Sequence, residues 1–207
     1  MIKRQTSYAN RGAPFEGFVR FANDRYLVHK MAVIDKVPTE FIPLRDKMGR
    51  ICGAKVEHKS VVDFIGRYKR YPIAIEAKHT SEDSIRFDEV QPHQAEYMDD
   101  FTEEPGTIGL VLVSFGLKHF YAIPWAFWQA AYNARVRPGA TRTKPATVEA
   151  FGTTWTIPPK FSVRMDELDP SWEVTGTDQQ FGLHYLENAL KYITPRGEAN
   201  HENATTS

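Results

Sequence analysis

The strongest constraint on the fold is the apolar run at residues 107–115, which reads TIGLVLVSF. Apolar and polar residues do not alternate in this run. That pattern is typical of a β-strand that is buried on both faces. The run is far shorter than the roughly 20 apolar residues that cross a membrane. We therefore expect a buried central strand and no membrane-spanning segment.

Length and composition predict one domain. The chain has 207 residues, of which 42% are hydrophobic and 13% aromatic, enough for a substantial core. Cys52 is the single cysteine, so an internal disulfide is excluded, and we expect it to be a small filler. With no apolar signal segment at the N-terminus, this predicts a reducing, cytoplasmic location. We expect a flexible basic arm at 1–7, a folded domain at 8–193 and a disordered tail at 194–207.

A spaced set of acids that ends in a lysine indicates chemistry. Asp63 stands in the run VVDFIG, and Glu76 and Lys78 follow in the run IEAK. Both segments have the pattern of short strands, and Gly66 and Pro72 punctuate the stretch between them. Residues two apart on a strand point to the same face. We therefore expect Glu76 and Lys78 to project together, with Asp63 brought beside them by strand pairing.

These three residue types suit phosphodiester hydrolysis. Two carboxylates can hold a hard divalent cation such as Mg²⁺. A lysine can orient a water or stabilise negative charge on a phosphate. The alternative is that a Glu-x-Lys pair is a solvated strand face, which is the commoner case. The abrupt polar end of an apolar strand favours the site, because buried charges need partners.

Charge is unevenly distributed along the chain although the formal net charge is zero. Residues 1–80 contain 16 Lys and Arg against 8 Asp and Glu, whereas residues 81–207 contain 10 against 18. The basic half holds the candidate site, which suits a polyanionic substrate. The alternative is that folding intermixes the two halves and removes the asymmetry.

Residues 40–58 are read as an exposed, basic β-hairpin. A glycine in a short polar segment separates two mixed runs there, and an irregular loop is the alternative. The basic residues of this region are Arg45, Lys47, Arg50, Lys55 and Lys59. A second basic segment at 134–147 is either a DNA-facing loop or a solvated linker.

The remaining elements alternate between helix and strand patterns. Pro14 suits the first turn of a helix, and the acid Glu16 is favoured there by the helix dipole. Its apolar residues at helical spacing are Phe15, Phe18, Val19, Ala22 and Tyr26. The other expected elements are a strand at 28–37, a polar loop at 80–88, helices from Pro92 and Pro124, and strands at 118–123 and within 153–163. We expect Trp125 and Trp128, in the second of these helices, to be core residues.

The order of these signals resembles a known family. It runs YANRG at 8–12, Glu16, the basic hairpin, DFIG at 63–66, EAK at 76–78 and HQ at 93–94. Over roughly residues 8–130, and more weakly to about 190, the chain resembles the RecU-type Holliday junction resolvases, a branch of the PD-(D/E)xK nuclease-like fold. The resemblance implies an α/β fold with a central mixed β-sheet flanked by helices, a restriction-endonuclease-like core and a protruding hairpin stalk at about 40–58.

The resemblance also implies an activity. It implies a homodimer that binds four-way DNA junctions and nicks two opposing strands, with Mg²⁺, or alternatively Mn²⁺, in each subunit. Asp63 and Glu76 correspond to the metal-binding acids, and the carbonyl of Ala77 to a further ligand. The residues with other implied roles are the catalytic lysine Lys78, the helix acid Glu16, the helix glutamine Gln94 and the phosphate-contacting Arg11.

Three features depart from the family pattern. Ile65 stands where a polar residue is common, the following turn is unusually basic, with Arg67, Lys69 and Arg70, and the acidic C-terminal part matches poorly. These departures concern the substrate more than the metal chemistry. Two other functions stay open: a nuclease of the same fold that cuts duplex or damaged DNA, and a DNA-binding recombination factor without catalysis. The intact acid and lysine set argues against the second, and the hairpin argues against the first.

Overall fold

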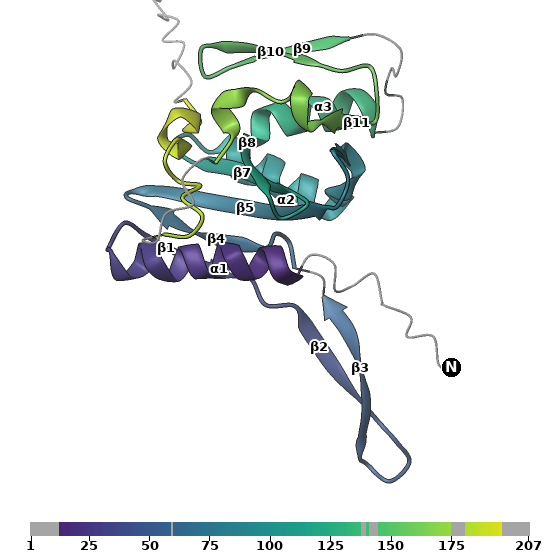
Figure 1. Ribbon diagram of the computed structural model, residues 1–207. Coiled ribbons are helices and arrows are strands. Elements are labelled where there is room, and N and C mark those ends of the chain that lie inside the picture. Colours follow the sequence, from purple (N-terminus) through teal and green to yellow (C-terminus); the bar gives the residue numbers. More distant parts are fainter. Residues whose placement is uncertain (1–12, 59, 138–139, 141–144, 175–180, 196–207) are drawn as a thin grey trace, which may run out of the picture.

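The computed structural model describes residues 13–58, 60–137, 140, 145–174 and 181–195 (Figure 1). A five-stranded sheet lies at its centre, in the order β1-β4-β5-β7-β8. Its strands are β1 (Ala32–Lys36), β4 (Phe64–Tyr68), β5 (Tyr71–Thr80), β7 (Ile108–Phe115) and β8 (His119–Pro124). Only β5 and β7 run parallel within this sheet, and the other neighbours are antiparallel. The predicted central mixed sheet flanked by helices is confirmed.

Every residue of β7 is buried, as its apolar run predicted. The side of β7 that carries Gly109 packs against α2 (Pro92–Glu103) and α3 (Trp125–Arg135). A Cβ at Gly109 would lie 2.7 Å from Thr102 Cγ2 and 2.9 Å from Trp125 Cβ, so glycine permits this close approach. Trp125 and Trp128 are both buried, which confirms them as core residues.

The other face of the sheet is covered by α1 (Ala13–Val28) and by a C-terminal segment. Phe15 of α1 stacks on Phe120 of β8, with ring centroids 5.8 Å apart. Four of the five predicted apolar positions of α1 are buried, but Phe18 is 46% exposed because it lies at the rim of the stripe. The strand expected from residue 28 begins only at Ala32, because α1 continues to Val28 and a turn follows.

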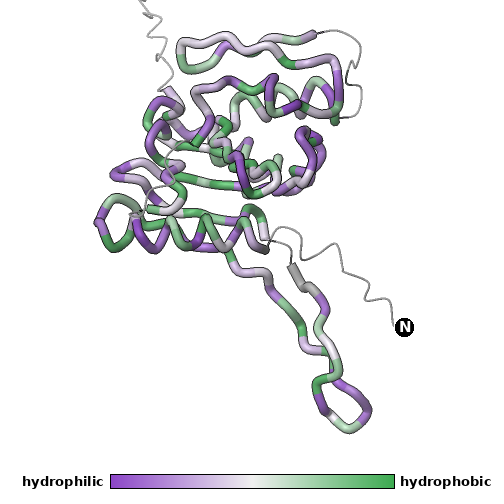
Figure 2. The backbone as a smooth tube through the Cα atoms, in the orientation of Figure 1, coloured by the Kyte–Doolittle hydropathy of each residue, from purple (hydrophilic) through white to green (hydrophobic). Residues whose placement is uncertain are grey.

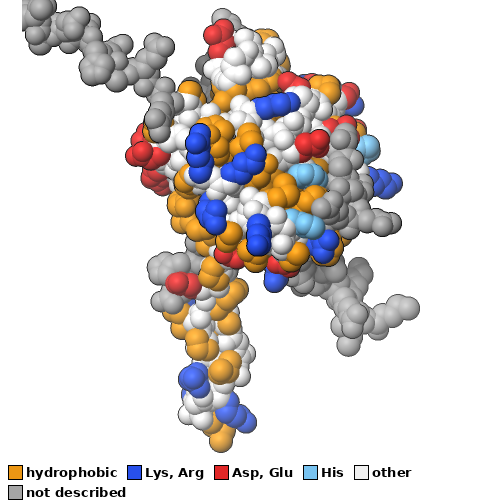
Figure 3. Space-filling view, turned by 90° about the vertical axis from the view of Figure 1, so that its left-hand side faces the viewer, with side chains coloured by type: hydrophobic (Ala, Val, Ile, Leu, Met, Phe, Trp, Pro, Cys, Tyr) orange, Lys and Arg blue, Asp and Glu red, His pale blue; other side chains and the backbone are white. Residues whose placement is uncertain are grey.

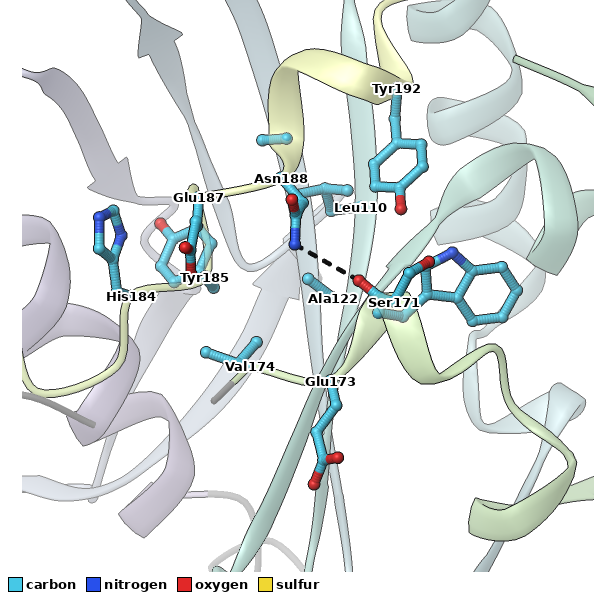
Figure 4. Close-up of a pocket in the computed structure, with 12 residues that line it drawn as sticks. Leu110, Ala122, Ser171, Glu173, Val174, His184, Tyr185, Glu187, Asn188 and Tyr192 are labelled. Atoms are coloured by element: carbon cyan, nitrogen blue, oxygen red, sulfur yellow. Dashed lines mark hydrogen bonds between the residues drawn. The ribbon is translucent and has the colours of Figure 1, made fainter. Parts of the chain in front are cut away.

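The C-terminal segment, residues 181–195, lies against α1 and the sheet (Figure 4). The Tyr185 hydroxyl donates to Asn23 Oδ1 on α1, and Asn188 Nδ2 donates to the Ser171 carbonyl at 3.4 Å. Thr194 N donates to the Thr107 carbonyl at 2.9 Å, so the expected tail does not begin before residue 195. The predicted arm at 1–7 and residues 196–207 lie outside the described residues.

Two stretches differ from expectation in ways that have clear causes. The predicted polar loop at 80–88 contains β6 (Ser84–Arg86), whose partner is β11 (Ser162–Arg164), and a 3-10 turn at Phe87–Glu89. It is ordered because Ile85 and Phe87, two apolar residues among charges, are buried. A separate hairpin of β9 (Ala146–Ala150) and β10 (Thr153–Ile157) also forms, and its first strand was not predicted.

Both interpretations of the segment 134–147, a DNA-facing loop and a solvated linker, are wrong for Arg135. Arg135 ends α3 with only 1% of its surface exposed, and its Nε donates to the Pro158 carbonyl at 2.9 Å. Arg137 is ion-paired with Asp99. The Arg135 guanidinium is therefore part of the protein interior, whereas the Arg137 side chain is 48% exposed. Arg142 and Lys144 lie outside the described residues.

The predicted hairpin is confirmed as β2 (Glu40–Arg45) and β3 (Ile51–His58), which project away from the body (Figure 1). Asp46 organises its tip by accepting from the backbone N–H groups of Met48 and Arg50 at 2.8 and 3.0 Å. Cys52 is exposed on β3, so it is not a filler. Apolar and polar stretches alternate along the hairpin (Figure 2), and its exposed apolar side chains are Phe41, Ile42, Leu44, Met48 and Ile51.

Within the described part of the chain, no helix has the length and apolar content that a membrane crossing requires.

Candidate active site

The site lies where β4 begins beside the middle of β5. Asp63 directly precedes β4, and the β4–β5 ladder pairs Phe64 with Ile75, which brings Asp63 opposite Glu76. Asp63 Oδ2 accepts from the Ala77 N–H at 2.9 Å, and its backbone carbonyl accepts from the Val37 N–H at 2.9 Å. Asp63 is therefore held from both neighbouring strands.

Gly66 makes this arrangement possible. A Cβ at Gly66 would lie 2.0 Å from the Val33 carbonyl oxygen and 2.6 Å from Ile34 Cα. These are backbone atoms, which cannot move aside without breaking the β1–β4 ladder. The glycine of the DFIG run therefore lets β1 pair closely enough with β4 to support Asp63.

Glu76 and Lys78 point to the same face of β5, as their spacing predicted. Lys78 Nζ lies 2.7 Å from Glu76 Oε1, and the carboxylate is only 1% exposed against 17% for the lysine side chain. This is the face that α2 covers, since Gln94 Nε2 donates to the same Glu76 oxygen at 2.7 Å. The site is thus a buried acid next to a lysine that reaches the surface.

Gln94 is oriented by the start of its own helix. The Gln91 N–H, which can only donate, donates to Gln94 Oε1 at 2.9 Å, and Lys78 Nζ donates to the same oxygen at 3.2 Å. The amide nitrogen must therefore face Glu76. The role of Gln91 was not predicted from the sequence. The signal was nevertheless present, because Gln91 directly precedes Pro92 and Gln94 follows Gln91 by three positions, as in a capping box.

The electrostatics of the two acids follow from burial. The pKa of Glu76 is raised to about 8, and desolvation by burial is the largest cause; the charge of Lys78 opposes this rise, and the negative charge of Asp63 adds to it. Desolvation also raises the pKa of Asp63, against the hydrogen bond from Ala77 and the charge of Lys78. Two close carboxylates in a low-dielectric position favour a proton or a cation between them.

The donor set fits a hard divalent cation. Glu76 Oε2 is buried and has no hydrogen-bond partner within the described residues, so this oxygen is available as a ligand. Across the same described residues, no group of three His, Cys, Asp or Glu side chains is placed to hold a metal. Mg²⁺ commonly binds through one or two carboxylates and keeps several waters, so Asp63, Glu76 and the Ala77 carbonyl are a sufficient set.

Glu16 does not join this cluster by direct contact. It lies in the first turn of α1, on the opposite side of the sheet from α2, and is ion-paired with Lys36. Its negative charge nevertheless contributes to the raised pKa of Asp63, after burial and the interactions with Ala77 and Lys78. The structure therefore brings Asp63, Glu76, Lys78 and Gln94 together and leaves Glu16 at their margin.

The predicted DNA contacts lie apart from the acids. Arg45, Lys47, Arg50 and Lys55 are all exposed on the hairpin. Arg50 is ion-paired with Asp46, and Arg45 donates to the Gly49 carbonyl at 2.9 Å, so these two also shape the tip. Arg11 and Lys59 lie outside the described residues.

The raised pKa of Glu76 predicts how stability depends on pH without metal. In the unfolded chain the carboxyl titrates near its ordinary value of 4.5, and in the folded state at about 8. Its stabilising contribution is complete below pH 4.5 and is lost as the pH rises to about 8, on the order of a few kcal/mol. We expect the melting temperature in EDTA to fall over this range, and Glu76→Gln to flatten the fall. If calorimetry gave the same fall of melting temperature with pH for the wild type and the Glu76→Gln variant, the raised pKa would not belong to Glu76.

The chain is similar in sequence to proteins of one known family. The family model described as RecU, Recombination protein U, matches residues 10–170. The Holliday junction resolvase RecU of Streptococcus agalactiae serotype Ia is 33% identical over 129 residues, which are 59% of this chain and 64% of that protein. The Holliday junction resolvase RecU of Streptococcus mutans serotype c is 33% identical over 129 residues, covering 59% and 66%.

The chain thus spans just under two thirds of the length of these curated relatives. Among solved structures, Archaeoglobus fulgidus Hjc, a Holliday junction resolvase from an archaeal hyperthermophile, overlaps with a TM-score of 0.32 and 15% identity, covering 53% of this chain and 73% of that one. The family model accounts for well over half of the 207 residues. The chain therefore belongs to the RecU family.

Proposed function

We propose that this protein is a structure-selective endodeoxyribonuclease that resolves four-way DNA junctions during recombination and repair. The observation that carries the proposal is the cluster of Asp63, Glu76, Lys78 and Gln94, in which Glu76 and Gln94 are buried, in a family whose named relatives are Holliday junction resolvases. A protein that only bound DNA would not need a buried and a half-buried carboxylate beside a lysine, because burying a charge costs stability.

Each residue of the cluster has a distinct task. Asp63, Glu76 and the Ala77 carbonyl would hold Mg²⁺ or Mn²⁺. Such an ion, when bound, neutralises phosphate charge and lowers the pKa of a bound water. The side chain of Lys78 is partly exposed, and its ammonium group beside Glu76 would stabilise negative charge on the scissile phosphate. Gln94 is a positioning residue, since it holds Glu76 and Lys78 in a fixed geometry.

The hairpin is the element that supports junction selectivity. It projects from the body and exposes Lys47 and Lys55, which make no ion pair with an acid in the part of the chain that the structure describes. Phosphates converge at the open centre of a four-way junction, and a linear duplex has no comparable point. Contacts of Lys and Arg with phosphates read this shape and not the base sequence.

Symmetric nicking requires two sites, so we include a homodimer in the proposal. The apolar side chains of Ala32 and Ile34 in β1 are buried within the protomer and offer no interface surface. The exposed apolar residues of α1 offer a surface instead, and they are Phe18, Phe21, Leu27 and Val28. The apolar residues of the hairpin are a second such surface.

Cleavage of a mobile four-way junction against a linear duplex of the same sequence tests the proposal. We expect paired nicks in opposing strands of the junction with Mg²⁺, none with EDTA, and little cutting of the duplex. Light scattering under the same conditions should give the mass of a dimer. Equal cutting of both substrates would favour a general duplex nuclease, and junction binding without cutting would favour a recombination factor without catalysis.

A further inference from the structure

Two basic turns lie side by side at one end of the sheet. The turn after α1 carries Lys30, and the β4–β5 turn carries Lys69 and Arg70, next to Arg67 at the end of β4. The Lys69 N–H donates to the Met31 carbonyl at 3.3 Å, which joins the two turns. We call the four exposed cations Lys30, Arg67, Lys69 and Arg70 the end patch. Figure 3 looks onto this end, where Lys and Arg side chains gather on the body and acids lie mostly at its margins.

The end patch has no acidic counterpart. Within the described residues, none of its four cations is ion-paired with a carboxylate. Cations elsewhere on the body commonly are, as in the pairs Arg86 with Asp88 and Lys160 with Glu167. Four like charges on adjoining turns repel one another, so their clustering lowers stability unless an anion binds.

Local conformation does not explain the lysines of the end patch. Lys30 and Lys69 have φ angles of 56° and 54°, in the left-handed region that favours glycine or asparagine. The arginine side chains are held by local contacts. Arg67 Nη1 donates to the Lys69 carbonyl at 3.0 Å, and Arg70 Nη2 donates to the Tyr71 hydroxyl at 2.8 Å. These contacts orient two guanidinium groups and leave most of their donors available.

The end patch and the hairpin lie on opposite sides of the metal-binding acids. The hairpin joins β1 and β4 at one end of the sheet, and the end patch lies at the other end of the same strands (Figure 1). Arg70 and Glu76 are separated by six positions along β5, or about 20 Å at about 3.3 Å per residue. Duplex DNA rises about 3.4 Å per base pair, so this distance corresponds to about six base pairs.

We propose that the end patch binds the phosphate backbone of a duplex arm that leaves the junction, about six base pairs from the cut phosphate. This inference rests on the proposed function. With the hairpin at the junction centre and a scissile phosphate at Asp63 and Glu76, an arm that follows β5 outward passes the end patch. Lys and Arg would contact phosphates there without reading bases.

The test uses a variant of the end patch and a chemically matched substrate. The variant is Lys30→Asn, Arg67→Gln, Lys69→Asn and Arg70→Gln, in which asparagine suits the left-handed turns. The control variant removes four cations from the opposite end: Arg86→Gln, Lys118→Gln, Lys160→Gln and Arg164→Gln. Binding is measured in EDTA to a junction with 20-base-pair arms, and to the same junction with neutral methylphosphonate linkages at the fifth to eighth positions of each arm.

We expect wild type and control to bind the neutral-linkage junction on the order of tenfold more weakly than the natural one. The end-patch variant should bind both equally, and its salt dependence should be shallower by about 0.9 per lost phosphate contact. The double variant Arg67→Gln/Arg70→Gln, which keeps both left-handed residues Lys30 and Lys69, should show an intermediate loss. If the end-patch variants bound the natural junction as tightly as wild type, the inference would be overturned. The remaining candidate for binding to the end patch would then be an acidic protein. Wild-type binding without Mg²⁺-dependent cutting would instead overturn the proposed function.

Discussion

Replacing Glu76 with glutamine is expected to lower the rate of junction cleavage by at least about 1,000-fold while junction binding persists. The substitution keeps the size of the side chain and can keep its contact with Lys78, but it removes a charged ligand from the centre of the site. Asp63→Asn should have the same effect, since an amide oxygen can still accept from the Ala77 N–H. With one negative charge fewer near the phosphate, binding should stay equal or tighten.

Single-turnover cleavage and filter binding on the same junction separate the two effects. Glu89→Gln is the matched control, because Glu89 is exposed and belongs to no described ion pair. Lys78→Ala should also remove turnover while circular dichroism stays unchanged. Full Mg²⁺-dependent cleavage by the Glu76 or Asp63 variant would exclude these carboxylates from the site.

Replacing residues 44–56 with a short Gly-Ser turn is expected to reduce the preference for junctions over duplex by about 10- to 100-fold. The hairpin buries few of its own apolar side chains, so its removal exposes no core, and Asp63 and Glu76 should remain in place. Competition between junction and duplex for binding measures the preference. Calorimetric titration with Mg²⁺ checks that the shortened protein still binds the ion.

A second variant separates charge from shape. Lys47→Gln/Lys55→Gln removes two cations but leaves the contacts of Asp46 with Arg50 and of Arg45 with Gly49 unchanged. We expect it to lower the salt dependence of junction binding by up to about 0.9 per lost contact and to keep part of the preference. If the shortened protein kept the original preference for junctions over duplex, selectivity would lie elsewhere on the body. The end patch would then be the next candidate.

The local sequence pattern was sufficient to predict those elements in which one hydrophobic period dominates. The apolar run of β7 predicted a strand buried on both faces, and the alternation of Glu76 and Lys78 predicted their contact, because strand geometry sets both. The glycine between two mixed runs predicted the hairpin at its observed bounds. The pattern failed at residues 80–88, where the two isolated apolar residues Ile85 and Phe87 gain burial from α3 and β11, far along the chain.

Local sequence was enough to name Asp63, Glu76 and Lys78 as candidate site residues, and the family resemblance added Gln94. Only folding shows which of these residues meet. Glu16 is directed to Lys36 because α1 covers the other face of the sheet, and Arg135 is buried because β10 supplies carbonyls for it. The end patch likewise forms only when two turns about 40 residues apart pair through Lys69 and Met31. Such contacts depend on packing between distant segments, which no local periodicity encodes.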